Sequence, residues 1–316
     1  MSYQIRPAKR SEAKPLIGLY ALSGCGKTLS ALYLSRGFVG PSGRIIMLES
    51  ESGRGEVYAD VLPGGYDVCP IRENFAPVEY GKALTEIERA SPQALIIDSA
   101  SHEWEGAGGV LAMAAENLSA GKKSVLVWQG PKMEHQRHFM LRLMMTPIPL
   151  VIVCMRAKFP MVEGVVNGKK EWSRSGDLEP KQSEDILSEM FLHGWIDKEH
   201  RFHGTKYTRD DLRSVLKSGE PITIDTGRRL SEWARAATEP LTVNAAAPSK
   251  DTSADKKVAL AAIRGFLSGL DLPMARSAVC AKVFGVETWS ELTRLPADRL
   301  AVGLASVSEG GPSRIE

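Results

Sequence analysis

Residues 21–28 combine residue types that can bind phosphate groups. They read Ala-Leu-Ser-Gly-Cys-Gly-Lys-Thr and lie between a short apolar run and a segment with leucine and alanine at helical spacing. Gly24 and Gly26 let backbone N–H groups approach phosphate oxygens, and a helix starting near Lys27 adds the positive end of its dipole. Ala21 stands where the strict pattern has glycine, and alanine is its smallest replacement. The pattern predicts a P-loop.

The side chains of this loop suit a nucleoside triphosphate. Lys27 is predicted to reach the β- and γ-phosphates, and the Thr28 hydroxyl to ligate magnesium. ATP and Mg²⁺ are therefore the expected cofactors. The residues expected to contact the nucleotide in this loop are Ser23, Gly24, Cys25, Gly26, Lys27, Thr28 and Leu29.

A second acidic segment is expected to complete the metal site. Residues 94–98 form an apolar run that ends in Asp98, which is the Walker B pattern for holding magnesium, often through water. The next residue is Ser99. The AAA+ class places its water-activating glutamate directly after this aspartate, so here the base must come from another segment.

Two segments offer that base. Glu49 and Glu51 lie at the end of the strand expected after the P-loop helix, and in a parallel sheet this end falls beside the phosphate loop. Glu103 and Glu105 follow Asp98 in a glycine-rich stretch and compete for the same role. The residues alone leave both alternatives open, with Glu51 favoured.

The order of patterns along the 316 residues predicts an α/β fold with a mainly parallel sheet flanked by helices. Its expected parts are an N-terminal arm (1–14), an ATPase core (15–239), a flexible linker (240–256) rich in Ala, Pro and Ser, and a small helical domain with a polar tail (257–316). The expected strands are 17–20, 44–48, 94–98, 124–128 and 150–155.

A β-hairpin is expected between residues 162 and 174, because two short arms flank Asn167-Gly168, a strong signal for a two-residue turn. Basic and aromatic residues alternate around it, as single-stranded nucleic acid requires. Four acidic residues between positions 158 and 181 reduce the net charge of that stretch to about +1, which is also typical of an ordinary solvated hairpin. The residues of this predicted DNA track are Lys158, Phe159, Lys169, Lys170, Trp172, Arg174 and Lys181. A second candidate track, after another expected strand, consists of Trp128, Lys132, His135, Arg137 and His138.

The overall composition excludes several classes of protein. Lys and Arg total 40 against 38 Asp and Glu, so the net charge of +2 gives no general basic field for nucleic acid. The longest apolar run is too short to span a membrane, and residues 1–14 lack the apolar core of a signal peptide. Four scattered cysteines fit a reducing compartment. We expect a cytoplasmic protein, in the host cell if it is encoded by a phage.

The strand end at Glu49-Ser50-Glu51, followed by Tyr58-Ala59, resembles the RecA-type recombinase ATPases. The resemblance implies that Glu51 orients the attacking water, and that Tyr58 stacks on adenine. The Asp98-Ser99 pair also fits. At the family's γ-phosphate-sensing glutamine this chain has Cys154, so Arg156 is expected to substitute, either as the sensor or as a phosphate contact across a subunit boundary.

More specifically, the chain resembles phage-encoded, core-only RecA relatives associated with single-strand annealing. The segments that carry this resemblance are 98–109, 155–158, 180–182 and 222–233. The resemblance implies a RecA-like core, binding of single-stranded DNA, and assembly into rings or filaments.

The leading hypothesis is thus an ATPase, stimulated by DNA, that anneals or exchanges DNA strands in phage-type recombination. One alternative is a P-loop motor or loader in DNA replication or packaging. Another is a nucleotide-binding switch with negligible turnover, in which the C-terminal helical domain recruits a protein partner.

Overall fold

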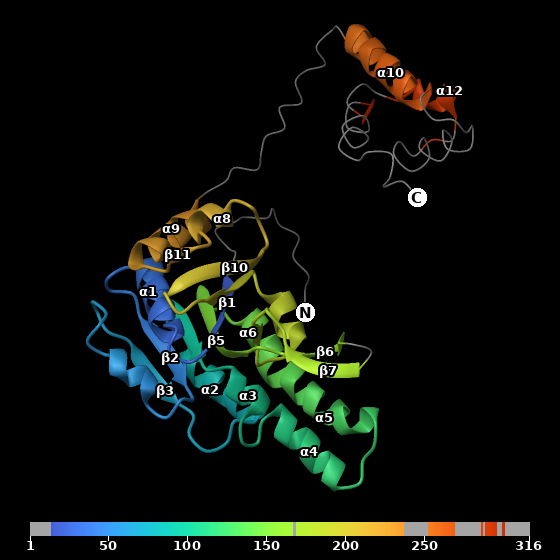
Figure 1. Cartoon of the computed structure of the whole chain (residues 1–316). Helices are drawn as coiled ribbons and strands as arrows, with labels where there is room; N and C mark the ends of the chain where they lie inside the picture. The colour runs from blue at the N-terminus through green and yellow to red at the C-terminus, as the bar shows by residue number, and fades with distance from the viewer. Residues whose placement is uncertain are drawn as a thin grey trace, which may run out of the picture. The chain divides into compact units, whose positions relative to one another are not determined.

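The structure is a computed structural model and describes residues 14–166, 169–236, 252–268, 286, 288–295 and 299–300. The chain divides into two units, residues 1–238 and 239–316 (Figure 1). The described helices of the second unit are α10 (Thr252–Ser268) and α12 (Trp289–Leu292). The first unit holds the sheet and every residue of the site described below.

The sheet of the first unit has the order β11-β10-β9-β1-β5-β4-β2-β3, and β8 pairs with β5 off this path. Neighbours from β9 to β3 run parallel, whereas β10 and β11 are antiparallel additions at one edge. The strands are β1 (Leu16–Ala21), β2 (Ile45–Glu49), β3 (Asp67–Pro70), β4 (Ala94–Asp98), β5 (Leu150–Lys158), β8 (Glu179–Pro180), β9 (Leu192–Ile196), β10 (Arg201–Tyr207) and β11 (Glu220–Pro221).

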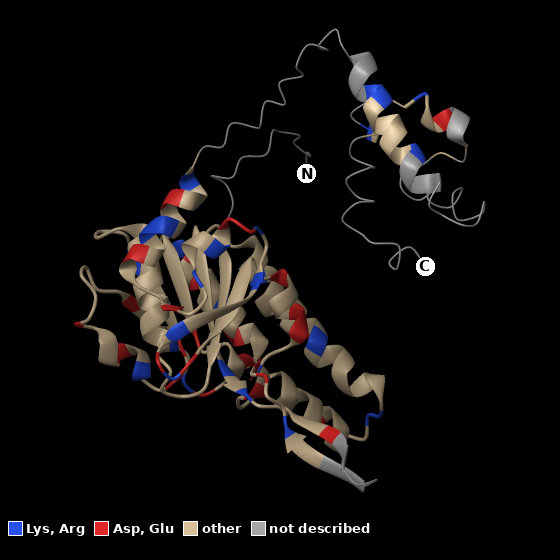
Figure 2. Ribbon diagram, turned by 45° about the horizontal axis from the view of Figure 1, so that its top comes forward, with Lys and Arg blue, Asp and Glu red and all other residues tan. Residues whose placement is uncertain are grey.

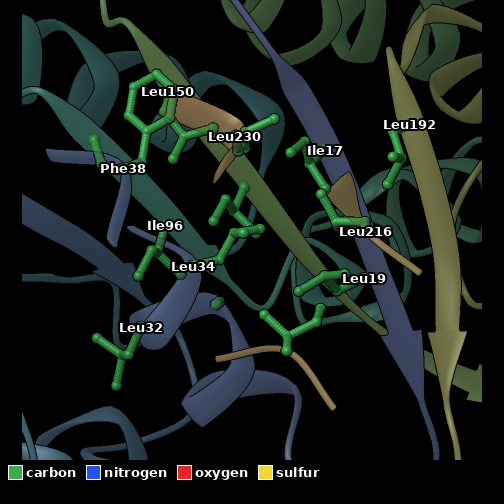
Figure 3. Close-up of a cluster of buried hydrophobic side chains, with 14 of the residues drawn as sticks. Ile17, Leu19, Leu32, Leu34, Phe38, Ile96, Leu150, Leu192, Leu216 and Leu230 are labelled. Carbon is green, nitrogen blue, oxygen red and sulfur yellow. The ribbon is translucent and has the colours of Figure 1, made fainter. Parts of the chain in front are cut away.

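Helices cover both faces of this sheet because side chains of the parallel strands alternate between two buried clusters. One cluster, drawn in Figure 3, packs strand residues such as Ile17, Leu19 and Ile96 against α1, α8 and α9. The other packs the intervening strand residues against α2, η3, α6 and α7. The helical segments of the unit are α1 (Lys27–Val39), η2 (Arg54–Tyr58), α2 (Pro77–Arg89), α3 (Ser101–Glu105), α4 (Val110–Ser119), α5 (Val125–His135), η3 (Gln136–Met140), α6 (Leu141–Met145), α7 (Glu184–Glu189), α8 (Leu212–Val215) and α9 (Ile224–Arg235).

The predicted fold class, α/β with a mainly parallel sheet flanked by helices, is confirmed. Four of the expected strands correspond to β1, β2, β4 and β5, with ends that differ by a few residues. These strands are largely apolar until their C-terminal ends because they are buried on both faces, as expected of a parallel sheet.

The strand expected over residues 124–128 is wrong, because this segment begins helix α5. Val127, Pro131 and His135 are its buried residues, at the four-residue spacing of a helix face, while Val125 is 74% exposed. Five residues rich in valine favour a strand by propensity, but the longer pattern is helical. Helices α4 and α5 form a pair that extends from the core (Figure 1).

The predicted hairpin is present as β6 (Met161–Val166) and β7 (Lys169–Arg174), which pair only with each other among the described strands. Val166 pairs with Lys169, so the register leaves two residues for the turn. The expected turn residues 167 and 168 lie outside the described residues.

The predicted N-terminal arm (1–14) and the polar tail lie almost wholly outside the described residues, as does most of the predicted linker. The linker prediction extends too far, because residues 252–256 belong to α10. Residues 252–256 read Thr-Ser-Ala-Asp-Lys, and Thr, Ser and Asp are residue types favoured at the start of a helix. No described helix has the length and apolar character needed to cross a membrane.

Helix α9 packs on α1, the P-loop helix, at a point where both helices have glycine. A Cβ atom on Gly227 would lie 2.2 Å from the Leu34 carbonyl oxygen and 2.8 Å from the Cα of Gly37. These neighbours are backbone atoms, which cannot rotate away. The absence of a side chain at Gly227 therefore sets the close approach of α9 to α1.

We expect Gly227→Ala to lower the free energy of unfolding by about 3 kcal/mol, because the added methyl group overpacks this contact. Urea denaturation measures the change. Gly130→Ala is the matched control, since Gly130 also lies inside a helix but has open space around its Cβ position. That substitution should raise stability by roughly 0.5 kcal/mol. Equal effects of the two substitutions would contradict the packing described here.

Candidate nucleotide-binding site

The predicted phosphate loop joins β1 to α1. Gly24 and Gly26 have φ angles of 82° and 86°, in the left-handed region that favours glycine, and α1 begins at Lys27. A cavity of about 1000 Å³ opens at this loop. The predicted loop residues that line it are Ser23, Gly24, Gly26, Lys27, Thr28 and Leu29. Cys25 does not line the cavity, because its side chain is buried in the core.

Lys27 and Thr28, the residues predicted to contact phosphate and metal, both line the cavity. The Lys27 ammonium is 3.4 Å from the carbonyl oxygens of Ala21 and Leu22, at the start of the loop. The Thr28 hydroxyl donates a hydrogen bond of 2.5 Å to a carboxylate oxygen of Asp98. Strand β5 separates β1 from β4, so this bond joins elements that are not neighbours in the sheet.

Asp98 and Thr28 fit a magnesium ion, since a carboxylate and a hydroxyl are the hard oxygen donors that this ion prefers. Asp98 is the last residue of β4 and is almost fully buried. Burial raises the pKa of Asp98 to about 6, and the hydrogen bond from Thr28 opposes this shift. A cation bound here would favour the ionised carboxylate.

Glu51 projects into the cavity, and Glu49 holds the turn that places it. Glu49 is fully buried, accepts hydrogen bonds from the backbone N–H groups of Glu51 and Gly53, and pairs with Arg72. Glu51 lines the cavity and its carboxylate accepts a 2.9 Å hydrogen bond from Nε of Arg156. Of this predicted acidic pair, only Glu51 faces the site.

The competing bases Glu103 and Glu105 have other partners. Glu103 is fully buried and bonds to His135 at 2.9 Å and to Gln182 at 3.2 Å. Glu105 pairs with the Lys181 ammonium at 3.2 Å. Neither carboxylate is among the lining of the cavity. Among these candidate bases, only Glu51 lines the cavity.

Arg156, near the end of β5, lines the cavity of its own chain. It stands opposite Ala21 in the register of β1 and β5. Cys154, which was expected to replace a sensing glutamine, is fully buried, and burial raises the pKa of its thiol well above the usual value. Arg156 thus lies in the cavity, and Cys154 does not.

The cavity is also lined by one further predicted residue and by several that the sequence reasoning missed. Tyr58, the predicted adenine contact, lines it from η2, and Tyr33 lines it from α1. His200 donates a 3.0 Å hydrogen bond from Nδ1 to the Cys25 carbonyl, with the ring against Gly26. Its place in the turn between β9 and β10 depends on pairing of these strands, which no local pattern predicts. Pro221, Ile222 and Thr223 also line the cavity, and the sequence reasoning did not place them there.

The predicted DNA track is only partly brought together. Lys158, Phe159, Trp172 and Arg174 are exposed on the hairpin or at its base, and Trp172 is 65% exposed. Lys169 and Lys170 lie on β7, but their side chains are not described. Both signs of charge occur along the hairpin (Figure 2). The expected place of Lys181 in this track is corrected by the structure. Strand β8 pairs with β5, and this pairing places Lys181 in the lining of the nucleotide cavity.

The loop between β1 and α1, the carboxylate at the end of β4 and the parallel sheet define a P-loop ATPase type of fold. No protein-family model matches the chain, and no curated protein matches it.

Two similar solved structures are ATPases of bacterial type III secretion systems. One is described as a prototypical ATPase from pathogenic bacteria, with 12% identity, a TM-score of 0.36, and coverage of 92% of this chain and 79% of that chain. The other is the assembled ATPase EscN of enteropathogenic E. coli, with 13% identity, a TM-score of 0.35, and coverage of 92% and 67%. The class stated above rests on this chain's own loop, strands and carboxylates.

Proposed function

We propose that this chain is a magnesium-dependent ATPase of the RecA-like type that binds single-stranded DNA and promotes annealing or strand exchange as a homo-oligomer. Lys27 neutralises the terminal phosphates, Thr28 and Asp98 hold the metal, and Glu51 orients the attacking water. The observation that carries the proposal is the cavity itself, where these groups converge on a P-loop.

The DNA part of the proposal is supported by the position of the hairpin. The end of β5 leads into the hairpin and forms one side of its stem, and Arg156 and Ala157 in this part of β5 line the nucleotide cavity. Trp172 and Arg174 are exposed farther along the hairpin. Bases stack on exposed aromatic rings, and arginine meets the phosphate backbone. This arrangement connects a nucleotide site directly to a surface suited to a single strand.

Binding of a fluorescently labelled oligonucleotide at low salt, followed by anisotropy, tests this part. We expect Trp172→Ala to weaken binding about tenfold, because one stacked base is lost. Trp128→Ala is the control, since Trp128 is an exposed tryptophan on α5 and not on the hairpin strands. Loss of binding with Trp128→Ala alone would move the DNA site to α5. Absence of binding by the unaltered protein would reject the DNA function.

A further inference from the structure

The chain enters and leaves the hairpin β6–β7 through two segments that are held together. Ala157 pairs with Pro180 where β5 meets β8, and the Lys181 N–H donates a 2.7 Å hydrogen bond to the Arg156 carbonyl. Arg156 and Lys181 thus lie side by side at the stem, although they are 25 positions apart in the sequence. Both line the nucleotide cavity.

The stem lies at the phosphate end of that cavity. Arg156 stands opposite Ala21, and the carbonyl of Ala21 is 3.4 Å from the Lys27 ammonium. The backbone hydrogen bond from the Lys181 N–H to the Arg156 carbonyl places Lys181 beside Arg156. A nucleotide whose β-phosphate rests on the loop at Gly24 and Gly26 would direct its terminal phosphate toward Lys27 and this stem.

The present partner of Lys181 is one that a phosphate can replace. Its ammonium is 3.2 Å from a carboxylate oxygen of Glu105, and the Lys181 side chain is 35% exposed. Ion pairs that solvent can reach contribute little net stability. A terminal phosphate carries more charge than a carboxylate and offers several acceptor oxygens, so it competes well for the same ammonium.

We propose that Lys181 binds the terminal phosphate of the nucleotide, beside Arg156, and so distinguishes a triphosphate from a diphosphate. This inference rests on the proposed nucleotide-binding function. It assigns the recognition of the third phosphate to the stem of the hairpin. A shift of Lys181 toward the phosphate would also move β8, because Lys181 directly follows β8 in the chain. Removing the Lys181 charge should weaken triphosphate binding and leave diphosphate binding intact.

Equilibrium binding of a fluorescent, non-hydrolysable ATP analogue and of fluorescent ADP, each with Mg²⁺, tests the inference. We expect Lys181→Gln to weaken binding of the ATP analogue about tenfold, the loss typical of one charge-assisted hydrogen bond, and to change ADP binding less than about twofold. Unchanged ADP binding also shows that the variant is folded. Lys82→Gln is the matched control, because Lys82 also pairs with a carboxylate, that of Glu79, but does not line the cavity.

Glu105→Gln separates phosphate binding from a structural role of the ion pair. Because this substitution frees Lys181, binding of the ATP analogue should be kept or strengthened. Equal weakening by Glu105→Gln and Lys181→Gln would show that the pair only supports the stem, and would overturn the inference. An unchanged ratio of analogue to ADP affinity in Lys181→Gln would overturn it as well. Failure of the unaltered protein to bind either nucleotide would instead reject the proposed function.

Discussion

Replacing Lys27 by alanine is expected to abolish ATP turnover, with kcat/KM falling by about a thousandfold, because the loss of a preorganised cation leaves charge on the transferred phosphoryl group unopposed. The Lys27 ammonium lines the cavity and its own contacts are two long hydrogen bonds of 3.4 Å to backbone carbonyls. The fold should therefore tolerate the change. Release of inorganic phosphate from Mg-ATP measures the effect.

Lys82→Ala provides the control for Lys27→Ala. Lys82 lies on α2, pairs with Glu79 at 2.8 Å and does not line the cavity. Its loss should leave turnover unchanged, since a solvent-exposed ion pair contributes little. Turnover by Lys27→Ala at the level of the unaltered protein would show that hydrolysis occurs elsewhere on the chain.

Glu51→Gln should keep ATP binding and lose hydrolysis, with kcat falling by a factor of about a hundred to ten thousand, the usual contribution of a general base. Glutamine has the shape of glutamate and can still accept the hydrogen bond from Nε of Arg156. It cannot accept a proton from water. Separate measurements of nucleotide affinity and of turnover distinguish the loss of the base from the loss of the site.

Glu105→Gln is the matched control for this second prediction, because Glu105 was the alternative base and its carboxylate faces Lys181 outside the cavity lining. It should retain turnover. If Glu51→Gln stays active while Glu105→Gln does not, the base has been assigned to the wrong segment.

The parts of the site with local sequence patterns were the most predictable. A phosphate-binding loop needs glycines, a lysine and a hydroxyl residue at fixed spacing. Residues 21–28 have this pattern, so their phosphate-binding role could be predicted without knowledge of the fold. The apolar run ending in Asp98 could be placed for a related reason, since a strand buried on both faces has few polar residues until its end. The positions of Thr28 and Asp98 then follow from the meeting of strand ends in a parallel sheet.

The parts that depend on pairing between distant segments could not be predicted in the same way. Lys181 belongs by sequence to a basic and aromatic stretch, but the pairing of β8 with β5 turns it toward the nucleotide cavity. His200 reaches the loop only because β9 lies beside β1. The segment 124–128 could not be assigned for a different reason: a short apolar run of five residues is compatible with either a strand or a helix.

The ATP turnover of the unaltered protein, measured at low salt with and without single-stranded DNA, tests the central claim most directly. We expect magnesium-dependent hydrolysis that rises when the oligonucleotide is added and that is lost in Glu51→Gln. Magnesium-dependent hydrolysis that stays the same at saturating oligonucleotide would contradict the connection between the nucleotide cavity and the hairpin. Absence of hydrolysis under both conditions would contradict the assignment of this chain as an ATPase.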